Sequence, residues 1–405
     1  MTRLHRVRVF RQAAGYCAAL LSSCALVAGL SLVSAGHRSA HARPSQSQPL
    51  RLALSPSRHW VPRRYDNPGI GRYPDIFNYF DFADARHGWW ARWGEKPYQL
   101  MRTADGGRTW VEQAPYAGPV EFISPQVGWV LGVPYPDETK PPPKLRIGIT
   151  TNGGKSWAWR VASDELRADA IAPVSGMECW AISVSPAKLT HTIDGGRTWQ
   201  QVRYRRSADP KALLAALAFF DQQHGWLLEQ NGHGMTVFRT ADGGRTFAFT
   251  NVPQVTPGGG LPYRFAFSTA QDGWLAVGGG SLLHTSDGGR KWVAVAPAVK
   301  GWSRLRLVDC SFPTRQVGWA VGSVGDRKGA VAICTRDGGR TWRQDETGAE
   351  PITYGWFYRV VFVDENHGWA AGEGGQYETD TPQLKEEHEV SFLLRYLASP
   401  MSPRE

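Results

Sequence analysis

Cysteine is scarce in this sequence, and its placement excludes most of the chemistry that cysteine supports. Two of the five cysteines, Cys17 and Cys24, fall in an apolar N-terminal stretch, which leaves Cys179, Cys310 and Cys334. These three lack metal-ligand spacing. The strand pattern described below puts Cys310 and Cys334 on the first and third strands of one sheet. They are then separated by about twice the ~4.8 Å strand spacing, beyond disulfide reach. We expect three buried free thiols.

Signatures of nucleic-acid, metal and phosphate binding are also missing. The formal charge is +10, but the first 42 residues carry five arginines and no acid, so the rest of the chain has a surplus of only five. There is no arginine-rich run, and we expect no nucleic-acid partner. The eleven histidines form no metal motif, and each Gly-Gly pair belongs to a turn between two strands rather than to a phosphate loop. Neither a metal nor a cofactor is expected.

One motif, Thr-x-Asp/Asn-Gly-Gly-Arg/Lys-x-aromatic, occurs six times. Its third position falls 42 to 50 residues apart, at Asp105, Asn152, Asp194, Asp242, Asp287 and Asp337. Such a period indicates a propeller or solenoid. The glycines permit positive φ in a tight turn, and the Asp side chain can accept hydrogen bonds from the turn's own amides. We interpret these residues as structural turn staples, because copies in six separate units cannot meet in one catalytic site.

A second motif, Gly-Trp, recurs in step with the first and marks seven units. Cys179-Trp180 replaces Gly-Trp in one unit, and a phenylalanine stands seven residues before the tryptophan in every unit except that one, where Pro173 stands instead. Four short strands per unit are typical of a propeller blade. The aromatic residue that closes the first motif, such as Trp342, is expected to be buried between blades. The sequence thus predicts an all-β fold, a seven-bladed β-propeller of four-stranded antiparallel blades.

The N-terminal region predicts an exported protein. Residues 1–42 begin with a basic segment and continue with 23 uncharged residues, 13–35. This is the pattern of an export signal or an N-terminal membrane anchor. Three outcomes remain open: cleavage, retention of 13–35 as an anchor, or lipidation at Cys24. In each case we expect a periplasmic or other extracytoplasmic protein.

The remaining segments complete the domain plan. We predict that residues 43–58 form a flexible linker, that residues 59–400 form a single propeller and that residues 401–405 form a tail. The seventh unit lacks the Gly-Gly turn and therefore its fourth strand. Residues 60–78 are expected to supply that strand, so that the N- and C-terminal segments together close the ring.

Candidate binding residues lie where the innermost strands begin. They are Arg264, Arg304, Arg306 and Arg359. They could converge at the central channel and bind an anion or an acidic partner, or they could be solvated strand ends. Two long connections, 133–144 and 373–389, could also carry function, as loops on a rigid ring often do, or they could be solvated insertions.

The motifs resemble two known groups of propellers. The Asp-Gly-Gly-Arg-Thr-Trp turn resembles the Asp-box, or BNR repeat, of sialidases, sortilins and several glycoside hydrolases. Gly-Trp-Ala-Val-Gly at 318–322, followed by Thr-x-Asp-Gly-Gly-Arg-Thr-Trp, is similar to the seven-bladed photosystem II stability/assembly factor family and its bacterial relatives. That resemblance covers about residues 79–372. It implies an exported, non-enzymatic protein that binds a protein partner, a membrane protein or its exported segment, and that is lumenal in a photosynthetic host. We also expect a monomer.

A sialidase-like glycoside hydrolase, or a glycan-binding propeller, is the alternative. Sialidase chemistry needs three arginines around a carboxylate, a Tyr–Glu nucleophile pair and an acid/base Asp. The nearest match to the expected arginine signature, at 71–74, departs at two of four places. Tyr377 and Glu378 are adjacent and would point to opposite faces of a strand. We therefore favour a non-catalytic scaffold.

Overall fold

The computed structural model describes residues 60–66, 76–93, 99–134, 145–162, 166, 168–207, 209–232, 234–253, 263–299, 304–325, 329–347, 354–375 and 390–398. Every regular element in these ranges is a β-strand, so the all-β prediction is confirmed. In the same ranges there is no helix that could cross a bilayer. The segment 13–35, the linker 43–58 and most of the two long connections, at 135–144 and 376–389, lie outside the described residues.

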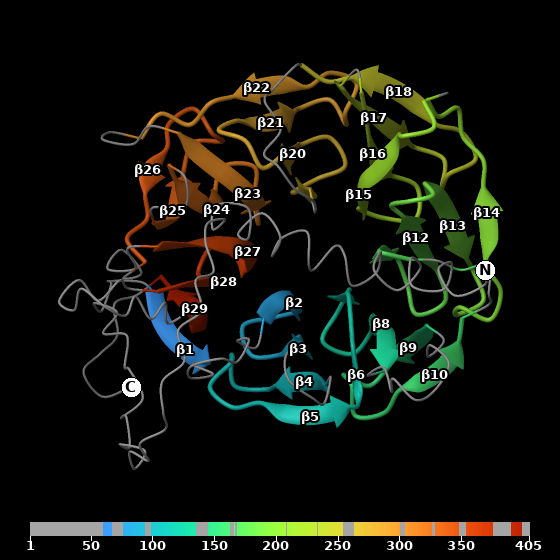
Figure 1. Cartoon of the computed structure of the whole chain (residues 1–405), viewed down its shortest axis with the longest axis horizontal. Helices are drawn as coiled ribbons and strands as arrows, with labels where there is room; N and C mark the ends of the chain where they lie inside the picture. Colours follow the sequence, from blue (N-terminus) through green and yellow to red (C-terminus); the bar gives the residue numbers. More distant parts are fainter. Residues whose placement is uncertain are drawn as a thin grey trace, which may run out of the picture. The chain divides into compact units, whose positions relative to one another are not determined.

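The strands form seven antiparallel sheets, the blades of a propeller (Figure 1). Blade one consists of β2 (Ile76–Phe82), β3 (Gly88–Trp93), β4 (Gln99–Thr103) and β5 (Val111–Ala114). Blade two consists of β6 (Tyr116–Ala117), β7 (Val120–Phe122), β8 (Gly128–Pro134), β9 (Arg146–Thr150) and β10 (Ala158–Val161). Blade three consists of β11 (Ala170–Pro173), β12 (Cys179–Ser183), β13 (Lys188–Thr192) and β14 (Gln200–Val202).

The remaining blades follow the same order. Blade four consists of β15 (Leu213–Phe219), β16 (Gly225–Asn231), β17 (Gly234–Thr240) and β18 (Ala248–Asn251). Blade five consists of β19 (Arg264–Phe267), β20 (Gly273–Ala276), β21 (Leu282–Thr285) and β22 (Val293–Val295). Blade six consists of β23 (Leu305–Ser311), β24 (Gly318–Val324), β25 (Ala330–Thr335) and β26 (Arg343–Gln344). Blade seven consists of β27 (Tyr354–Asp364), β28 (His367–Gly375), β29 (Val390–Leu397) and β1 (Trp60–Asp66).

The innermost strands contact one another in sequence around a closed ring. They are β2, β7, β11, β15, β19, β23 and β27, and β27 in turn contacts β2. Blade two differs from the four-stranded plan because the short strand β6 also pairs with β8. The seven-bladed prediction is confirmed, with this one addition.

Strand β1 closes the ring by pairing with β29 as the outermost strand of blade seven. At its start, Trp60 meets Phe362 edge-on at 5.9 Å and 88°. In blade one, Trp110 of the Asp-box meets Phe82 in the same way, at 6.2 Å and 77°. Trp60 therefore takes the place of the aromatic residue that blade seven lacks. The prediction that an N-terminal segment supplies this strand is confirmed.

Adjacent blades are joined by aromatic stacking. The Gly-Trp tryptophan of one blade stacks on the repeated phenylalanine of the next, as in Trp226 on Phe267 at 3.5 Å and Trp319 on Phe362 at 3.5 Å. Trp369 stacks on Phe82 at 3.6 Å across the closure between blades seven and one. All seven tryptophans at this position are at most 1% exposed. These flat, fully buried contacts make the blade interfaces the main hydrophobic core.

The aromatic residues of the Asp-boxes are less buried than predicted. Trp292 is buried at 3% exposure, whereas Trp342 and the others are half-buried. Trp342 meets Trp274 and Phe312 edge-on at 6.0 and 6.1 Å, and its indole N–H donates to the carbonyl of Gly339. These rings cover the outer rim of each interface rather than filling its centre.

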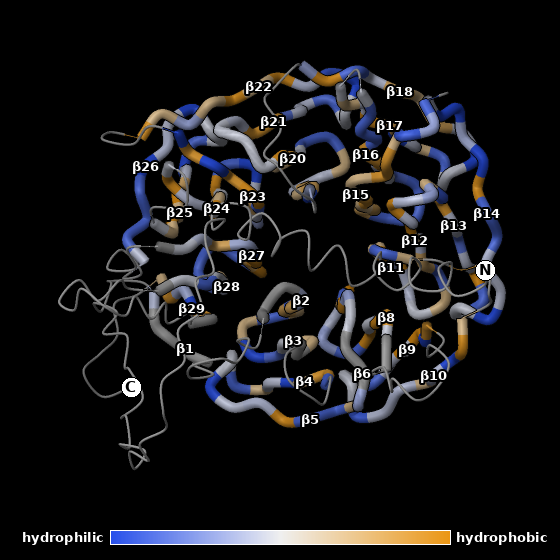
Figure 2. Tube along the Cα trace, in the orientation of Figure 1, coloured by the Kyte–Doolittle hydropathy of each residue, from blue (hydrophilic) through white to orange (hydrophobic). Residues whose placement is uncertain are grey.

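Burial of side chains falls from the inner strands of a blade to its outermost strand. Cys179, Cys310 and Cys334 are buried free thiols, as predicted. The outermost strand β26, by contrast, is exposed and coloured mostly hydrophilic in Figure 2. The hydrophilic side chains of β26 make this edge less prone to pair with a strand of another chain.

Candidate binding site at the centre of the ring

Charged side chains gather where the innermost strands face the centre of the ring. They stand one or three residues before the repeated phenylalanine, where the alternation of a strand turns them to the opposite face. The five are Asp81, Glu121, Arg264, Asp309 and Arg359, from blades one, two, five, six and seven. We call them the central cluster. Blades three and four carry alanines at the same positions, namely Ala170, Ala172, Ala216 and Ala218.

Glu121 links opposite sides of the ring through two arginines. Its carboxylate lies 4.0 Å from the guanidinium of Arg264 and 3.8 Å from that of Arg359. Asp309 lies at 4.0 and 3.9 Å from the same two arginines. Because blade two reaches blades five and seven in this way, the cluster must lie near the axis of the ring.

Two of the carboxylates also tie neighbouring blades together. Asp81 accepts hydrogen bonds from the amide of Phe82 at 2.9 Å and from that of Phe122, in the next blade, at 2.6 Å. Asp309 does the same with Cys310 at 2.9 Å and Val360 at 3.0 Å. These bonds satisfy buried backbone groups that the sheets leave unpaired at their inner edge.

Burial dominates the titration of the cluster. It raises the pKa of Asp81 to about 7, with help from the charge of Glu121 and against the attraction of Arg359. Burial likewise raises the pKa of Asp309, against Arg359 and Arg264. Burial and the charge of Arg359 lower the pKa of Arg264. Burial also acts to lower the pKa of Arg359, but Asp309, Glu121 and Asp81 outweigh it and raise that pKa.

The four arginines suggested by the sequence do not all come together. Arg264 and Arg359 share the cluster, where the side chain of Arg264 is 22% exposed and that of Arg359 only 9%. Arg304 and Arg306 are exposed at the start of β23, and none of the ion pairs described for the cluster involves them. Sequence reasoning missed the three carboxylates. Alignment of each inner strand on its phenylalanine would have found them, since Asp81 and Glu121 occupy one register position and Asp309 shares that of the two arginines.

The Asp-boxes lie away from this cluster and make hydrogen bonds within their own turns. In the copy at 335–342, the hydroxyl of Thr335 donates to Asp337, whose carboxylate also accepts from the amide and hydroxyl of Thr341. The bonds from Thr341, with that from Thr335, hold the pKa of Asp337 at about 2. Within the described residues, no group of three His, Cys, Asp or Glu side chains could hold a metal ion.

Comparison with known proteins agrees with this architecture. The family model for the photosynthesis system II assembly factor YCF48 matches residues 207–301. Among curated proteins, the photosystem II assembly lipoprotein Ycf48 of Synechocystis sp. (strain ATCC 27184 / PCC 6803 / Kazusa) is 36% identical over 105 residues. The corresponding protein of Picosynechococcus sp. (strain ATCC 27264 / PCC 7002 / PR-6) is 32% identical over 116 residues. The protein is a BNR-type β-propeller that resembles the photosystem II assembly factors.

The sequence similarity is local, whereas the structural similarity extends over most of the chain. The alignment with the Synechocystis protein covers 25% of this chain and 28% of that protein, so the chain spans less than a third of the curated relatives it matches. The solved structure of YCF48 bound to D1 peptide covers 84% of this chain and 97% of its own, with a TM-score of 0.55 and 20% identity. The structure of YCF48 from Cyanidioschyzon merolae covers 84% of this chain and 98% of its own, with a TM-score of 0.55 and 19% identity. At this identity the structures show a shared fold alone.

Proposed function

We propose that this protein is an exported, non-catalytic scaffold that binds a protein partner, a membrane protein or its exported segment, during the assembly or stabilisation of a membrane complex. Support comes from the resemblance to the photosystem II assembly factors, one of which has been solved with a D1 peptide. The central cluster supports a binding role, because it concentrates partly exposed charge on a rigid ring. We assign no photosystem to the host.

The observation that carries a binding site is the position of Glu121 between Arg264 and Arg359. Its carboxylate is 33% exposed and lies about equally far from both guanidinium groups, at 4.0 and 3.8 Å. An acidic side chain of a partner could replace Glu121 there and make charge-assisted hydrogen bonds to the arginines. Glu121 then acts as an internal competitor for the partner's acid. Arg304 and Arg306 stay in the proposal as exposed basic residues at the start of a neighbouring inner strand.

Affinity capture with the full chain from its native membranes tests this proposal. Arg264→Gln should weaken recovery of the partner by about 10-fold or more, the value of a hydrogen bond to a charged group. Glu121→Gln should strengthen it, because the competing carboxylate is removed. Arg203→Gln is the matched control, since Arg203 is an exposed arginine that follows β14, away from the cluster. Repeated capture without any specific protein would contradict the scaffold.

A glycosidase assay tests the alternative reading. Purified protein should not turn over fluorogenic sialosides or other aryl glycosides. Robust turnover that Arg264→Ala abolishes would overturn the scaffold in favour of a sialidase-like enzyme.

A further inference from the structure

All six Asp-box turns lie on one face of the ring, which we call the turn face. Each box bonds to the turn between the first two strands of its own blade, as in the amide of Gly195 to the carbonyl of Met177 at 2.8 Å and that of Gly243 to Gln223 at 3.0 Å. The second glycine of a box also lies against the tryptophan of the preceding blade. An added Cβ at Gly244 would come within 2.2 Å of Trp180. Because this contact repeats from blade to blade, the boxes share one side of the ring.

The turn face carries an exposed cation in every box, directly after the Gly-Gly pair. These residues are Arg108, Lys155, Arg197, Arg245, Arg290 and Arg340, and all six are exposed. The box aspartates are half-buried, and their carboxylate oxygens accept hydrogen bonds from residues of the turn, as those of Asp242 do from the hydroxyls of Thr240 and Thr246. The outermost charge of each box is therefore positive, and the six cations are spread around the ring at equivalent positions.

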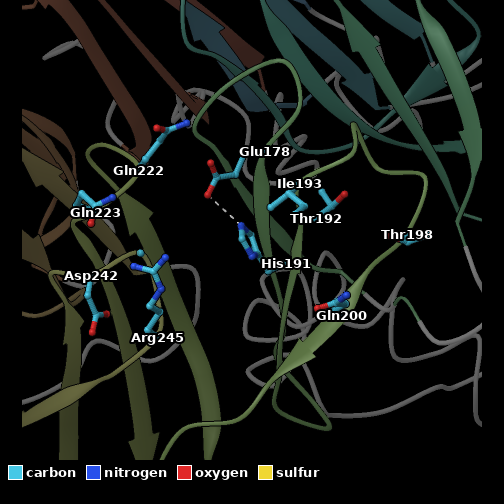
Figure 3. Close-up of a pocket in the computed structure, with 11 residues that line it drawn as sticks. Glu178, His191, Thr192, Ile193, Thr198, Gln200, Gln222, Gln223, Asp242 and Arg245 are labelled. Carbon is cyan, nitrogen blue, oxygen red and sulfur yellow. Dashed lines mark hydrogen bonds and ion pairs between the residues drawn. The ribbon is translucent and has the colours of Figure 1, made fainter.

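Large apolar side chains are exposed on the same face, over blades three and four. Met177 is 50% exposed, Ile193 70% and Phe220 47%. Ile193 lines a groove of about 360 Å³ between these blades, together with Glu178, His191, Gln222, Asp242 and Arg245 among others. Met177 directly precedes Glu178 in the sequence, and Phe220 stands two residues before Gln222. Figure 3 shows Asp242 and Arg245 on one wall and the hydrogen-bonded pair of Glu178 and His191 on the other. Four of the other exposed large apolar residues, Val111, Val161, Phe249 and Val293, lie on outermost strands instead.

We propose that the turn face binds the surface of an anionic lipid bilayer. The six cations would lie at the level of the phosphates, and Met177, Ile193 and Phe220 would enter the interface. A bilayer suits this face better than a protein does, because the six cations form an extended array. They outnumber the exposed carboxylates of the adjoining turns, Asp84, Asp221 and Asp364, each of which is paired with a histidine. The apolar side chains protrude from turns without the continuous apolar centre of a protein interface. Basic side chains near an anionic bilayer are each worth about 1 kcal/mol.

Hydrogen exchange of the full chain with vesicles tests the proposal. We expect anionic vesicles, phosphatidylcholine with about one third phosphatidylglycerol, to slow exchange at residues 190–198 and 219–224, and neutral vesicles to leave it unchanged. Raising the salt concentration should reverse the effect without any substitution, because screening weakens attraction to the surface. Equal protection by neutral vesicles would overturn the proposal. Protection that needs membrane protein rather than lipid would show instead that the face docks to a protein.

A triple variant localises the effect. Lys155→Gln/Arg197→Gln/Arg245→Gln removes three turn-face cations next to the apolar side chains. It should raise the lipid concentration needed for half-maximal protection on the order of 100-fold. The matched control, Arg203→Gln/Arg205→Gln/Lys211→Gln, removes the same charge from the exposed connection between blades three and four, and it should behave as the wild type. Unchanged lipid dependence in the first variant would refute the assignment. Partner capture at the central cluster should be unaffected by either triple variant, so the two proposals fail independently.

Discussion

The interfaces between blades repeat the same residues, whereas the centre of the ring carries different residues in different blades. At the interfaces, the same tryptophan–phenylalanine stack recurs, from Trp89 on Phe122 to Trp369 on Phe82. At the centre, one register position holds acid in blades one and two, Asp81 and Glu121, and alanine in blades three and four. Because neighbouring blades have similar sheets, the same aromatic stack packs well at each interface and is repeated. The inner strands are not constrained in this way, and the residues at their central positions differ between blades. These differences give the centre of the ring a charged side and an apolar side.

Blade three departs from the repeated pairing of phenylalanine and glycine. Pro173 and Cys179 are cross-strand partners, and they replace the phenylalanine and glycine found elsewhere. In blade four, a Cβ at Gly225 would lie 2.4 Å from the ring of Phe219. The glycine is therefore required by the phenylalanine beneath it, and a cysteine fits in blade three because proline leaves the space open.

The largest effect is expected from breaking an interface. Trp319→Ala should lower the free energy of unfolding by about 3–5 kcal/mol, because a fully buried ring that stacks on Phe362 is replaced by a cavity. Trp342→Ala should cost clearly less, since that ring is half-buried. Chemical denaturation of both variants checks the order, and equal losses would show that the rim rings carry as much of the interface as the stacked ones.

A substitution at the centre should come next. Asp309→Ala is expected to cost about 3 kcal/mol, because it leaves Arg264 and Arg359 with less compensation in a buried site and removes a bond to Val360. Denaturation at neutral pH measures the loss. Ala218→Ser, which changes the apolar side of the ring, is the control and should have little effect. A stable Asp309→Ala variant would mean that the cluster is not structurally tied to the ring.

The raised pKa of Asp81 should make the stability of the protein depend on pH. Its pKa of about 7 in the folded state lies above the unfolded value of 3.8, so the fold favours the protonated form. Its contribution is complete below pH 4, falls as the pH rises toward 7 and is lost above it. Asp81→Asn should remove this fall, which is worth roughly 2 kcal/mol between pH 5 and 7. Asp337→Asn, whose native pKa is about 2, should leave the slope between pH 4 and 7 unchanged. Parallel profiles for wild type and Asp81→Asn would refute the shift.

The smallest effect is expected at Pro173 and Cys179 of blade three, which stand where the other blades have phenylalanine and glycine. Pro173→Phe alone should destabilise the protein, because the new ring meets the side chain of Cys179. The double variant with Cys179→Gly should recover about 1–2 kcal/mol through the restored stack on Trp129. A double-mutant cycle from thermal melts measures this coupling. Strict additivity would show that the two positions do not depend on each other.

The sequence predicted the elements whose physical cause is local or repeated. Gly-Gly turns, alternating strands and the Gly-Trp period led to seven blades and to closure by the N-terminal strand. The missing fourth strand of blade seven was predicted, but the role of Trp60 was not, because Trp60 stands outside the repeat that would have marked it. The burial of Trp342 was overestimated, since a repeated position does not reveal how deep in an interface it lies.

The sequence by itself determined the blade, because turn chemistry and strand alternation act over a few residues and are copied along the chain. Only the tertiary structure decided which charges meet. Glu121 and Arg359 are separated by most of the chain, yet ring closure brings them to 3.8 Å. Their encounter depends on the register of seven inner strands at once, and no local pattern encodes it. The exposed cations of the Asp-boxes became one surface for the same reason, because stacking between blades aligns all six turns on a single face.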